Sequence, residues 1–517
     1  MGAHSRCHFI FFVILLIINA WQILLCNFNM TKSVSSFLFY SFRHPIQIPA
    51  MKKLYMLCSM AMLFVFTLFT VKVYAAVVLS PPFSDHMVLQ RGMPIPVWGK
   101  ADAGEQVTVA FNGQTQKAKA GNDGKWKVVF KTMKEAGPLN MTITGTNTVT
   151  LTDIYIGEVW QCAGQSNVDL TLNNDGQFHG RFKDTIKNAN LPMMRYMNMR
   201  PPRTSSAAWQ VITPQTAGGC SATSFFFGKE ILKSVNCAVG LMVTAVGGTL
   251  IEGWWDPATV AANPGIMTTK DKRTGKGIVP GILFNQYVAP VVGYGIKGTM
   301  WIQGEQNTYD TVMTPKYAGQ FKMIINGWRK AWGQGNFPFY YGQLSSERPN
   351  KPNMIVDTTA FIAMVREAQR EALKLPNTAM AVMCDFKSGG WHYPQKPEAG
   401  YRLALPAKAL LYGQKNLEYE GPLYSGIKIK GNKAIIKFTH TGSGLMAKDG
   451  ELKSFVITGK DHKWAAATAV INGDRVEVSS PEVAEPTEVR YGWQDRVTGN
   501  LYNKEGLPAS PFRSDIL

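Results

Sequence analysis

Residues 154–167 read IYIGEVWQCAGQSN, an apolar run that ends in Gly164-Gln165-Ser166-Asn167. The run predicts a buried strand, and the small and polar residues after it predict a tight turn at the strand's end. Far downstream, residues 391–394 read WHYP. A serine hydroxyl becomes nucleophilic when an imidazole accepts its proton, so Ser166 and His392 form a candidate pair for acyl transfer. Alone the pair is a weak signal, because serine in such a turn caps helices more often than it attacks esters.

Five further segments strengthen the signal, because all six occur in one order that is typical of one enzyme family. The six segments are 160–169 (WQCAGQSNVD), 218–228 (GGCSATSFFFG), 245–254 (AVGGTLIEGW), 300–307 (MWIQGEQN), 328–344 (WRKAWGQGNFPFYYGQL) and 365–385 (VREAQREALKLPNTAMAVMCD). Together they resemble the sialate O-acetylesterase family of carbohydrate esterases, which belongs to the SGNH hydrolases. Val168 and Asp169 are mild departures, since the family has Met-Glu there.

The resemblance implies an ester hydrolase in which Ser166 is the nucleophile and His392 the base. Negative charge that develops on the acyl oxygen needs hydrogen-bond donors already in place. By resemblance these donors are the backbone N–H of Ser166, an N–H of the Gly247-Gly248 turn and the side-chain amide of Gln303.

Two further polar residues of the same segments, Asn167 and Glu305, are expected to organise the site without taking part in the chemistry. No Cys or His spacing matches a zinc site, so the sequence predicts neither a metal nor another cofactor.

One departure from the family affects the mechanism directly. Relatives carry an aspartate two or three residues before the histidine, and here those positions hold Gly389 and Gly390. Loss of such an orienting acid costs roughly 10⁴ in turnover in a serine triad. Three explanations stay open: Asp385 substitutes for the missing acid, a backbone carbonyl orients His392 and leaves a Ser-His pair, or hydrolysis is lost and sugar binding remains.

The fold that the resemblance and the patterns predict is α/β, with a three-layer α/β/α SGNH centre between two β-sandwich-like domains. The expected parts are an over-extended N-terminus (1–50), a signal peptide (51–75), an N-terminal β domain (76–152), the catalytic domain (153–413) and a C-terminal β domain (414–517). Alternating strand-like and helix-like segments support the α/β centre. Strand-like runs broken by turn residues, as at Asn112-Gly113, support the outer domains.

Two helices are expected late in the central part. Residues 361–372 place apolar side chains at helical spacing, and that helix should stop near Pro376. Pro406 lies inside the helix-like stretch 402–412, and proline is tolerated only in a helix's first turn. We therefore expect this helix to begin near Leu405.

The first 75 residues read as targeting sequence. Met51-Lys52-Lys53, an apolar run over 54–71 and a small-residue exit predict a secretory signal peptide cleaved after Ala75. The mature chain is then secreted or periplasmic, without stable membrane insertion. A second apolar stretch, 9–25, lies near the lower length limit of a membrane span, and we interpret it as lying upstream of the true start at Met51.

The chain is basic, with 54 Lys and Arg against 35 Asp and Glu and a net charge of +19. Six of the basic residues and none of the acidic ones lie in the first 75, which leaves +13 for the mature chain. No basic run with interleaved aromatic residues occurs, so nucleic acid is not an expected partner. The surplus favours encounters with anionic glycans or is spread over a solvated surface.

Four cysteines follow the predicted cleavage point. Cys162 and Cys384 lie in apolar runs and should be buried, so at most one disulfide is expected.

The predicted partner is an acetylated sugar or glycan, and the predicted reaction is hydrolysis of its acetyl ester. Sialic acid is the resemblance's default substrate, and acetylated xylan is the nearest alternative. Two arginines, Arg348 and Arg402, are candidates to bind a sialic acid carboxylate. A catalytically impaired sugar-binding relative is the alternative of a different class. The tryptophans of the matching segments (Trp160, Trp254, Trp255, Trp301 and Trp391) are either core residues or platforms for a sugar ring.

Overall fold

The computed structural model describes residues 76–200, 207–265, 278–309, 312, 314–345, 360–386 and 390–515. The predicted over-extended N-terminus (1–50), the predicted signal peptide (51–75) and Arg348 lie outside these residues. Residues 74–517 form one compact unit.

A mostly parallel sheet runs through the middle of the described chain. Its order is β10-β9-β11-β8-β12-β13-β14, and all neighbours are parallel except β10 and β9. The strands are β8 (Thr148–Gly164), β9 (Leu191–Asn198), β10 (Trp209–Ile212), β11 (Val239–Ala245), β12 (Gly298–Ile302), β13 (Phe339–Gly342) and β14 (Thr378–Ala381). The chain lays β9 and β11 on one side of β8 and then crosses to build β12, β13 and β14 on the other. Ligands of such sheets bind at the carboxyl ends of the strands beside this reversal.

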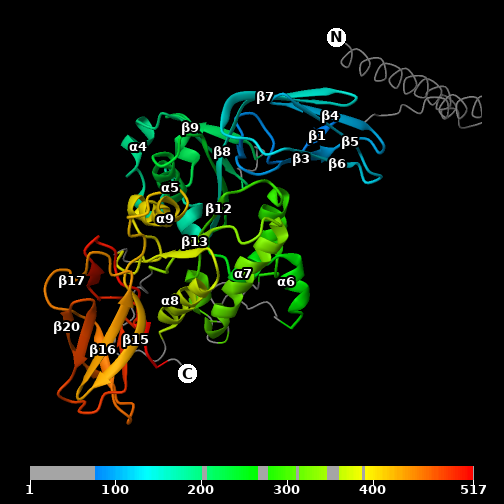
Figure 1. Ribbon diagram of the computed structural model, residues 1–517. Coiled ribbons are helices and arrows are strands. Elements are labelled where there is room, and N and C mark those ends of the chain that lie inside the picture. The colour runs from blue at the N-terminus through cyan, green and yellow to red at the C-terminus, as the bar shows by residue number, and fades with distance from the viewer. Residues whose placement is uncertain are drawn as a thin grey trace, which may run out of the picture. The chain divides into compact units, whose positions relative to one another are not determined.

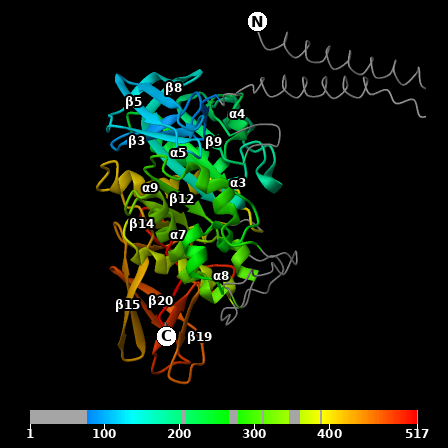
Figure 2. The ribbon, with the colours of Figure 1, turned by 90° about the vertical axis from the view of Figure 1, so that its right-hand side faces the viewer.

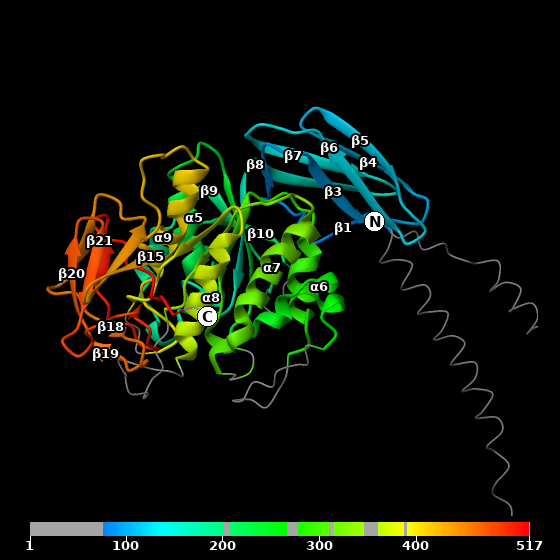
Figure 3. The same ribbon diagram turned by 60° about the horizontal axis from the view of Figure 1, so that its bottom comes forward.

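Helices cover both faces of this sheet (Figure 3). Trp160 and Cys162 of β8 belong to one buried cluster together with α5 (Ala222–Leu232) and α9 (Lys396–Leu410). The alternate residues Val159 and Ala163 belong to a second cluster with α7 (Tyr317–Trp332) and α8 (Phe361–Glu371). Successive side chains of a strand point to opposite faces, so the sheet lies between two helical layers. The predicted mixed α/β class is confirmed.

The N-terminal strands belong to two sheets, of which one is continuous with the central sheet through β8 (Figure 1). They are β1 (Val78–Leu79), β2 (Val88–Gln90), β3 (Ile95–Lys100), β4 (Gln106–Phe111), β5 (Gln114–Lys119), β6 (Lys125–Phe130) and β7 (Ala136–Thr144). Strands β2, β4, β5 and β7 belong to the sheet that contains β8, and β1, β3 and β6 form a separate three-stranded sheet. The first part of β8 pairs with β7 and its last part with β11 and β12. The boundary expected between residues 152 and 153 therefore falls inside one continuous strand, at Asp153, where φ is +52°.

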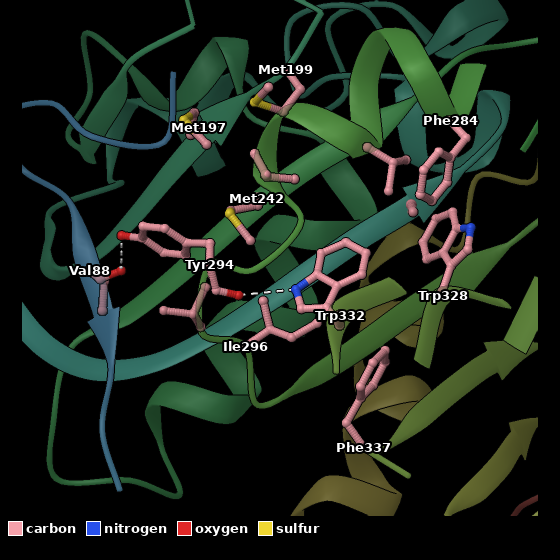
Figure 4. Packing of buried hydrophobic residues seen from close by; sticks show 14 of the residues in the cluster. Val88, Met197, Met199, Met242, Phe284, Tyr294, Ile296, Trp328, Trp332 and Phe337 are labelled. Atoms are coloured by element: carbon pink, nitrogen blue, oxygen red, sulfur yellow. Dashed lines mark hydrogen bonds between the residues drawn. The ribbon is translucent and has the colours of Figure 1, made fainter. Parts of the chain in front are cut away.

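Buried contacts fasten these strands to α7. Tyr294 donates its hydroxyl hydrogen bond to the carbonyl of Val88 in β2 at 2.7 Å, and Trp332 donates its indole N–H to the carbonyl of Tyr294 at 3.0 Å (Figure 4). Both tyrosine and tryptophan are at least nine-tenths buried. Such aromatic residues fill a core while their polar ends find partners.

The C-terminal strands, in orange and red in Figures 1 and 2, form three small antiparallel groups. They are β15 (Leu423–Lys430), β16 (Lys433–Thr439), β17 (Leu445–Ala447), β18 (Phe455–Thr458), β19 (Ala465–Ala466), β20 (Thr468–Asn472), β21 (Arg475–Ser479), β22 (Glu488–Tyr491), β23 (Leu501–Asn503) and β24 (Phe512–Arg513). Fully buried Arg366 of α8 donates hydrogen bonds to the carbonyls of Gln494 and Asp495 and so ties this group to the centre.

Of the two helices predicted late in the central part, one ends close to the predicted position and the other begins earlier than predicted. Helix α8 ends at Glu371 and a 3₁₀ turn follows, close to the predicted stop. The prediction for Pro406 is wrong, because α9 begins at Lys396 and contains this proline. Helix α9 packs closely along α5 and buries Ala399, Leu403 and Ala407. This burial outweighs the hydrogen bond that proline cannot make.

Candidate active site

Ser166 begins the short helix α3 (Ser166–Asp169) immediately beyond the carboxyl end of β8. Gly164 pairs with Ala245 of β11 and Ile302 of β12, so three parallel strands end side by side at this point. A Cβ built on Gly164 would lie 2.0 Å from the carbonyl oxygen of Ile302, and its φ is +134°. Only glycine allows β8 to turn into the serine helix this close to β12.

A cavity of about 400 Å³ opens above these strand ends. Its lining joins the serine turn, the glycine turn after β11, the segment after β12 and the histidine loop: Gln165, Ser166, Asp169, Leu170, Gly247, Gly248, Glu305, Gln306, Tyr309, Trp391 and His392. The structure therefore brings the predicted nucleophile and the predicted base to one cavity. Their side chains make no hydrogen bond with each other in the described chain.

His392 is half-buried, and its ring nitrogens have no hydrogen-bond partner among the described residues. Gly176 is a neighbour of this ring, because a Cβ built on Gly176 would lie 3.3 Å from Nδ1. Burial, and then the positive charge of Lys396, lower the pKa of His392 below its ordinary value. The imidazole is thereby favoured in its neutral form, which can accept a proton.

Asp385 does not orient His392, which corrects one of the three explanations. Its carboxylate accepts hydrogen bonds from Arg402 at 2.7 and 2.9 Å and from the Tyr502 hydroxyl at 3.2 Å. The paired contact with a guanidinium is the geometry that carboxylates favour, and it holds Asp385 away from the histidine. The same pairing makes Arg402 unavailable as a substrate carboxylate binder.

The glycine turn carries a partner that the sequence did not suggest. Asp169 Oδ2 accepts a hydrogen bond from the N–H of Gly247 at 3.0 Å and another from Arg200 at 2.8 Å. The N–H groups of Ser166 and Gly248 have no hydrogen-bond partner among the described residues. Of the predicted backbone donors, these two are ready to receive an oxyanion, whereas that of Gly247 is occupied.

Gln303 does not reach the cavity, so its predicted role as a donor is wrong. It is fully buried, and its amide nitrogen donates to the carbonyl of Thr249 and to Asn307 Oδ1. Its amide oxygen accepts a hydrogen bond from the Tyr317 hydroxyl at 2.8 Å. The amide is thus fully satisfied inside the protein.

Gln306, three residues later, is the side-chain amide of this segment that lines the cavity. Only 6% of the residue is exposed, and its Nε2 has no hydrogen-bond partner among the described residues. A buried amide without a partner is unusual and invites a ligand oxygen. The sequence offered one signal, since the resembled family has serine where this chain has Gln306.

Asn167 and Glu305 lie where organising residues are expected. The Asn167 amide donates to Glu305 Oε1 at 2.7 Å and to the carbonyl of Trp391 at 3.1 Å. Burial raises the pKa of Glu305 to about 6. Lys396 donates to Asn167 Oδ1 at 2.7 Å and is itself fully buried. The sequence does not indicate a role for this lysine, because lysine is rarely buried and an isolated lysine forms no recognisable motif.

The aromatic residues divide clearly between core and cavity. Four of the five tryptophans considered above are fully buried: Trp160, Trp254, Trp255 and Trp301. Trp391 is partly exposed, lines the cavity and packs against Tyr309 with ring centroids 5.3 Å apart. These two rings form an aromatic surface at the cavity.

The remaining features of the described residues concern metals, thiols and membranes. No group of three or more His, Cys, Asp or Glu side chains in this part of the chain is arranged to hold a metal ion. Cys162, Cys220, Cys237 and Cys384 are buried free thiols, as expected for the two in apolar runs. No helix within the described ranges has the length and apolar character needed to cross a membrane.

Comparisons relate this chain to known carbohydrate esterases. A family model described as carbohydrate esterase, sialic acid-specific acetylesterase, matches residues 156–394, which include Ser166 and His392. The sialate O-acetylesterase of Homo sapiens is 29% identical over 489 residues, covering 83% of this chain and 91% of that protein. The sialate O-acetylesterase of Rattus norvegicus is 27% identical and covers 84% of this chain and 93% of that protein.

A solved structure extends the match to the whole described architecture. The crystal structure of a carbohydrate acetylesterase from Xanthomonas citri has a TM-score of 0.77 and 32% sequence identity. The match covers 86% of this chain and all of that one. The chain therefore belongs to the sialate O-acetylesterase family of carbohydrate esterases and is a carboxylic-ester hydrolase.

Proposed function

We propose that this chain is a secreted carbohydrate O-acetylesterase that removes acetyl groups from sugar hydroxyls through an acetyl-enzyme on Ser166. The observation that carries the proposal is the single cavity lined by Ser166, His392 and the Gly247-Gly248 turn. A sugar acetate placed there meets a nucleophile, a base and unoccupied hydrogen-bond donors together.

The reaction follows from the chemistry of these groups. The Ser166 oxygen attacks the acetyl carbon while its proton passes to His392. The bond from carbon to the sugar oxygen then breaks, and His392 returns the proton to that oxygen. Water, activated by the same imidazole, attacks the acetyl-enzyme, and acetate leaves with Ser166 restored.

The negative charge on the acyl oxygen needs donors that are free to receive it. The backbone N–H groups of Ser166 and Gly248 meet this requirement, and the unpartnered amide of Gln306 is the side-chain candidate. Asp169 occupies the N–H of Gly247 in this structure. Each donor is worth about 10² to 10³ in rate.

The base works without a carboxylate on Nδ1 in this proposal. Gly176 lies beside that nitrogen, where a Cβ would come within 3.3 Å of it, and in this proposal the ring is held by packing alone. The catalytic set is then the Ser166 and His392 pair of the second explanation, but without its carbonyl, since no backbone carbonyl among the described residues accepts a hydrogen bond from Nδ1.

The acetylated sugar itself is the finer part of the proposal. Curated relatives are sialate O-acetylesterases and the matching solved structure is a carbohydrate acetylesterase, so both sialic acid and neutral polysaccharide esters deserve direct comparison. A sialic acid carboxylate would need a cation to bind it. Arg402 is hydrogen-bonded to Asp385, whereas Arg200 is partly exposed and hydrogen-bonded to Asp169 of the cavity lining. Secretion, after cleavage near Ala75, rests on the apolar run over 54–71.

Acetate release tests the proposal. The full chain and its Ser166→Ala variant are incubated with O-acetylated sialic acid and with acetylated xylan. We expect release from at least one substrate by the parent and a loss of about 10⁶ in the variant. Equal release by parent and variant rejects Ser166 as the nucleophile.

A sugar-binding protein without hydrolysis is the second candidate, favoured by the absence of a carboxylate on His392 among the described residues. It predicts glycan binding by calorimetry with no acetate release by the parent. Rapid hydrolysis of a small activated acetate ester, abolished in Ser166→Ala, excludes it.

A further inference from the structure

A buried lysine stands behind the catalytic cavity. Lys396 is the first residue of α9, is 0% exposed, and donates from Nζ to Asn167 Oδ1 at 2.7 Å. Asn167 follows Ser166, and its amide donates to Glu305 and to the carbonyl of Trp391, the neighbour of His392. The Lys396 ammonium is therefore connected through Asn167 to the serine turn, to the segment after β12 and to the histidine loop.

The surroundings of Lys396 explain how a charge is kept in the interior. Asp175 Oδ1 lies 4.0 Å from Nζ, and the ring centroid of Tyr393 lies 4.3 Å from it. Asp175 is 1% exposed, and neither of its carboxylate oxygens has a hydrogen-bond partner among the described residues. Arg181 lies 3.8 Å from the other oxygen of Asp175. Buried charges cost several kcal/mol when they lack partners, so the ammonium and the carboxylates stabilise each other.

The same charge acts on the base. The charged and titratable groups of the elements packed around His392 are Asp169, Asp175, His179, Arg181, Glu305 and Lys396. Of these, Lys396 is the one that, after burial, lowers the pKa of His392. Burial lowers the pKa of Lys396 itself to about 8, so the ammonium persists at neutral pH.

We propose that Lys396 is a positioning residue for ester hydrolysis, which fixes Ser166 and His392 relative to each other through Asn167. The inference rests on the proposed function. Lys396 takes over the geometric role of the missing triad acid, but its charge has the opposite sign. A carboxylate on Nδ1 stabilises the imidazolium, whereas a neighbouring ammonium opposes it.

The test compares three variants with the parent on an activated acetate ester. Lys396→Met removes the charge and keeps most of the stem, and Lys396→Arg keeps the charge. Lys396→Met combined with Asp175→Asn removes one charge of each sign and serves if the single variant does not fold. Thermal unfolding checks each fold, and kcat and KM are measured from pH 4.5 to 9.5.

The acid limb of kcat/KM reports the protonation of His392 in the free enzyme. In Lys396→Met we expect this limb to move to higher pH by about 0.5 to 1 unit, because a like charge has been removed. In the double variant we expect a smaller move in the same direction, because the carboxylate of Asp175 is removed as well. We expect kcat to fall about 10- to 100-fold at pH 7 with KM little changed, because the reacting groups lose alignment. Lys396→Arg should keep the limb in place. An unmoved limb in a folded Met variant overturns the inference.

A second readout needs no charge-removing variant. As pH rises through about 8, Lys396 loses its proton, and we expect kcat/KM of the parent to fall severalfold. Lys396→Arg stays charged and should lack this step. A parent and an arginine variant with the same alkaline profile contradict the inference. Activity that survives Ser166→Ala instead contradicts the proposed function, so the two failures are distinguishable.

Discussion

The carboxylate of Asp385 lies seven residues before His392 in sequence, yet it binds Arg402 and Tyr502 instead. The family resemblance singled out Ser166, Asn167 and Glu305, which follow directly after strands β8 and β12, where the chain leaves little freedom. It could not place Asp385, because a carboxylate in a loop pairs with whichever cation the fold brings nearest.

The Asp385→Asn variant tests this assignment. We expect kcat/KM at pH 7 to change less than about tenfold, because His392 does not depend on this carboxylate. We expect stability to fall by about 3 kcal/mol, because Arg402 is left buried with a weaker partner. Measurements are made well below the variant's unfolding midpoint, with urea unfolding as the measure of stability. A loss of about 10³ or more in kcat in folded protein would restore Asp385 to the triad.

Gln303 and Gln306 also show that residue type and spacing do not determine which side chain faces the cavity. Both are amides near the end of β12, and residue type alone does not distinguish them. The Gln303 amide is buried and hydrogen-bonded to three partners. The Gln306 amide lines the cavity, and its Nε2 has no hydrogen-bond partner among the described residues. Which amide faces a cavity depends on the turn between them, and no local pattern reports that turn.

The strand β8 leads directly to Ser166, the proposed nucleophile, and Gly164 is its critical residue. Local patterns predicted β8 and the turn at Asn112-Gly113 that joins β4 to β5, because each depends on neighbouring residues. They failed at α9, where packing along α5 overrides the local effect of Pro406.

Gly164→Ala should damage both stability and activity. A Cβ there would lie 2.0 Å from the carbonyl oxygen of Ile302 at a φ of +134°, so β8 and β12 must separate. We expect a loss of about 3 kcal/mol or more in urea unfolding. Activity should also fall in the remaining folded protein, because Ser166 moves with β8.

Gly319→Ala is the matched control. Gly319 is an exposed residue of α7, and a Cβ there meets no atom within 4 Å. We expect this change to stabilise the chain by about 0.5 to 1 kcal/mol and to leave activity unchanged. Equal stability of Gly164→Ala and the parent would show that the strand ends are not packed as described.

Over the whole described molecule, the strands before and after the catalytic part are joined to it in different ways. Strands β2, β4, β5 and β7 belong to the same sheet as β8, whereas the C-terminal strands are held by side chains such as Arg366. Sequence patterns predicted a boundary between residues 152 and 153. They could not predict a strand shared by two regions, because its apolar pattern is the same in both.

The proposed function depends on one covalent event, the transfer of an acetyl group to Ser166. The parent chain is mixed with an activated acetate ester, quenched in acid within the first turnovers and digested for peptide mass mapping. We expect an acetyl group on the Ser166 peptide of the parent and none on that of Ser166→Ala. Ester turnover with no acetyl on Ser166, or with acetyl on another residue that is needed for activity, would contradict it.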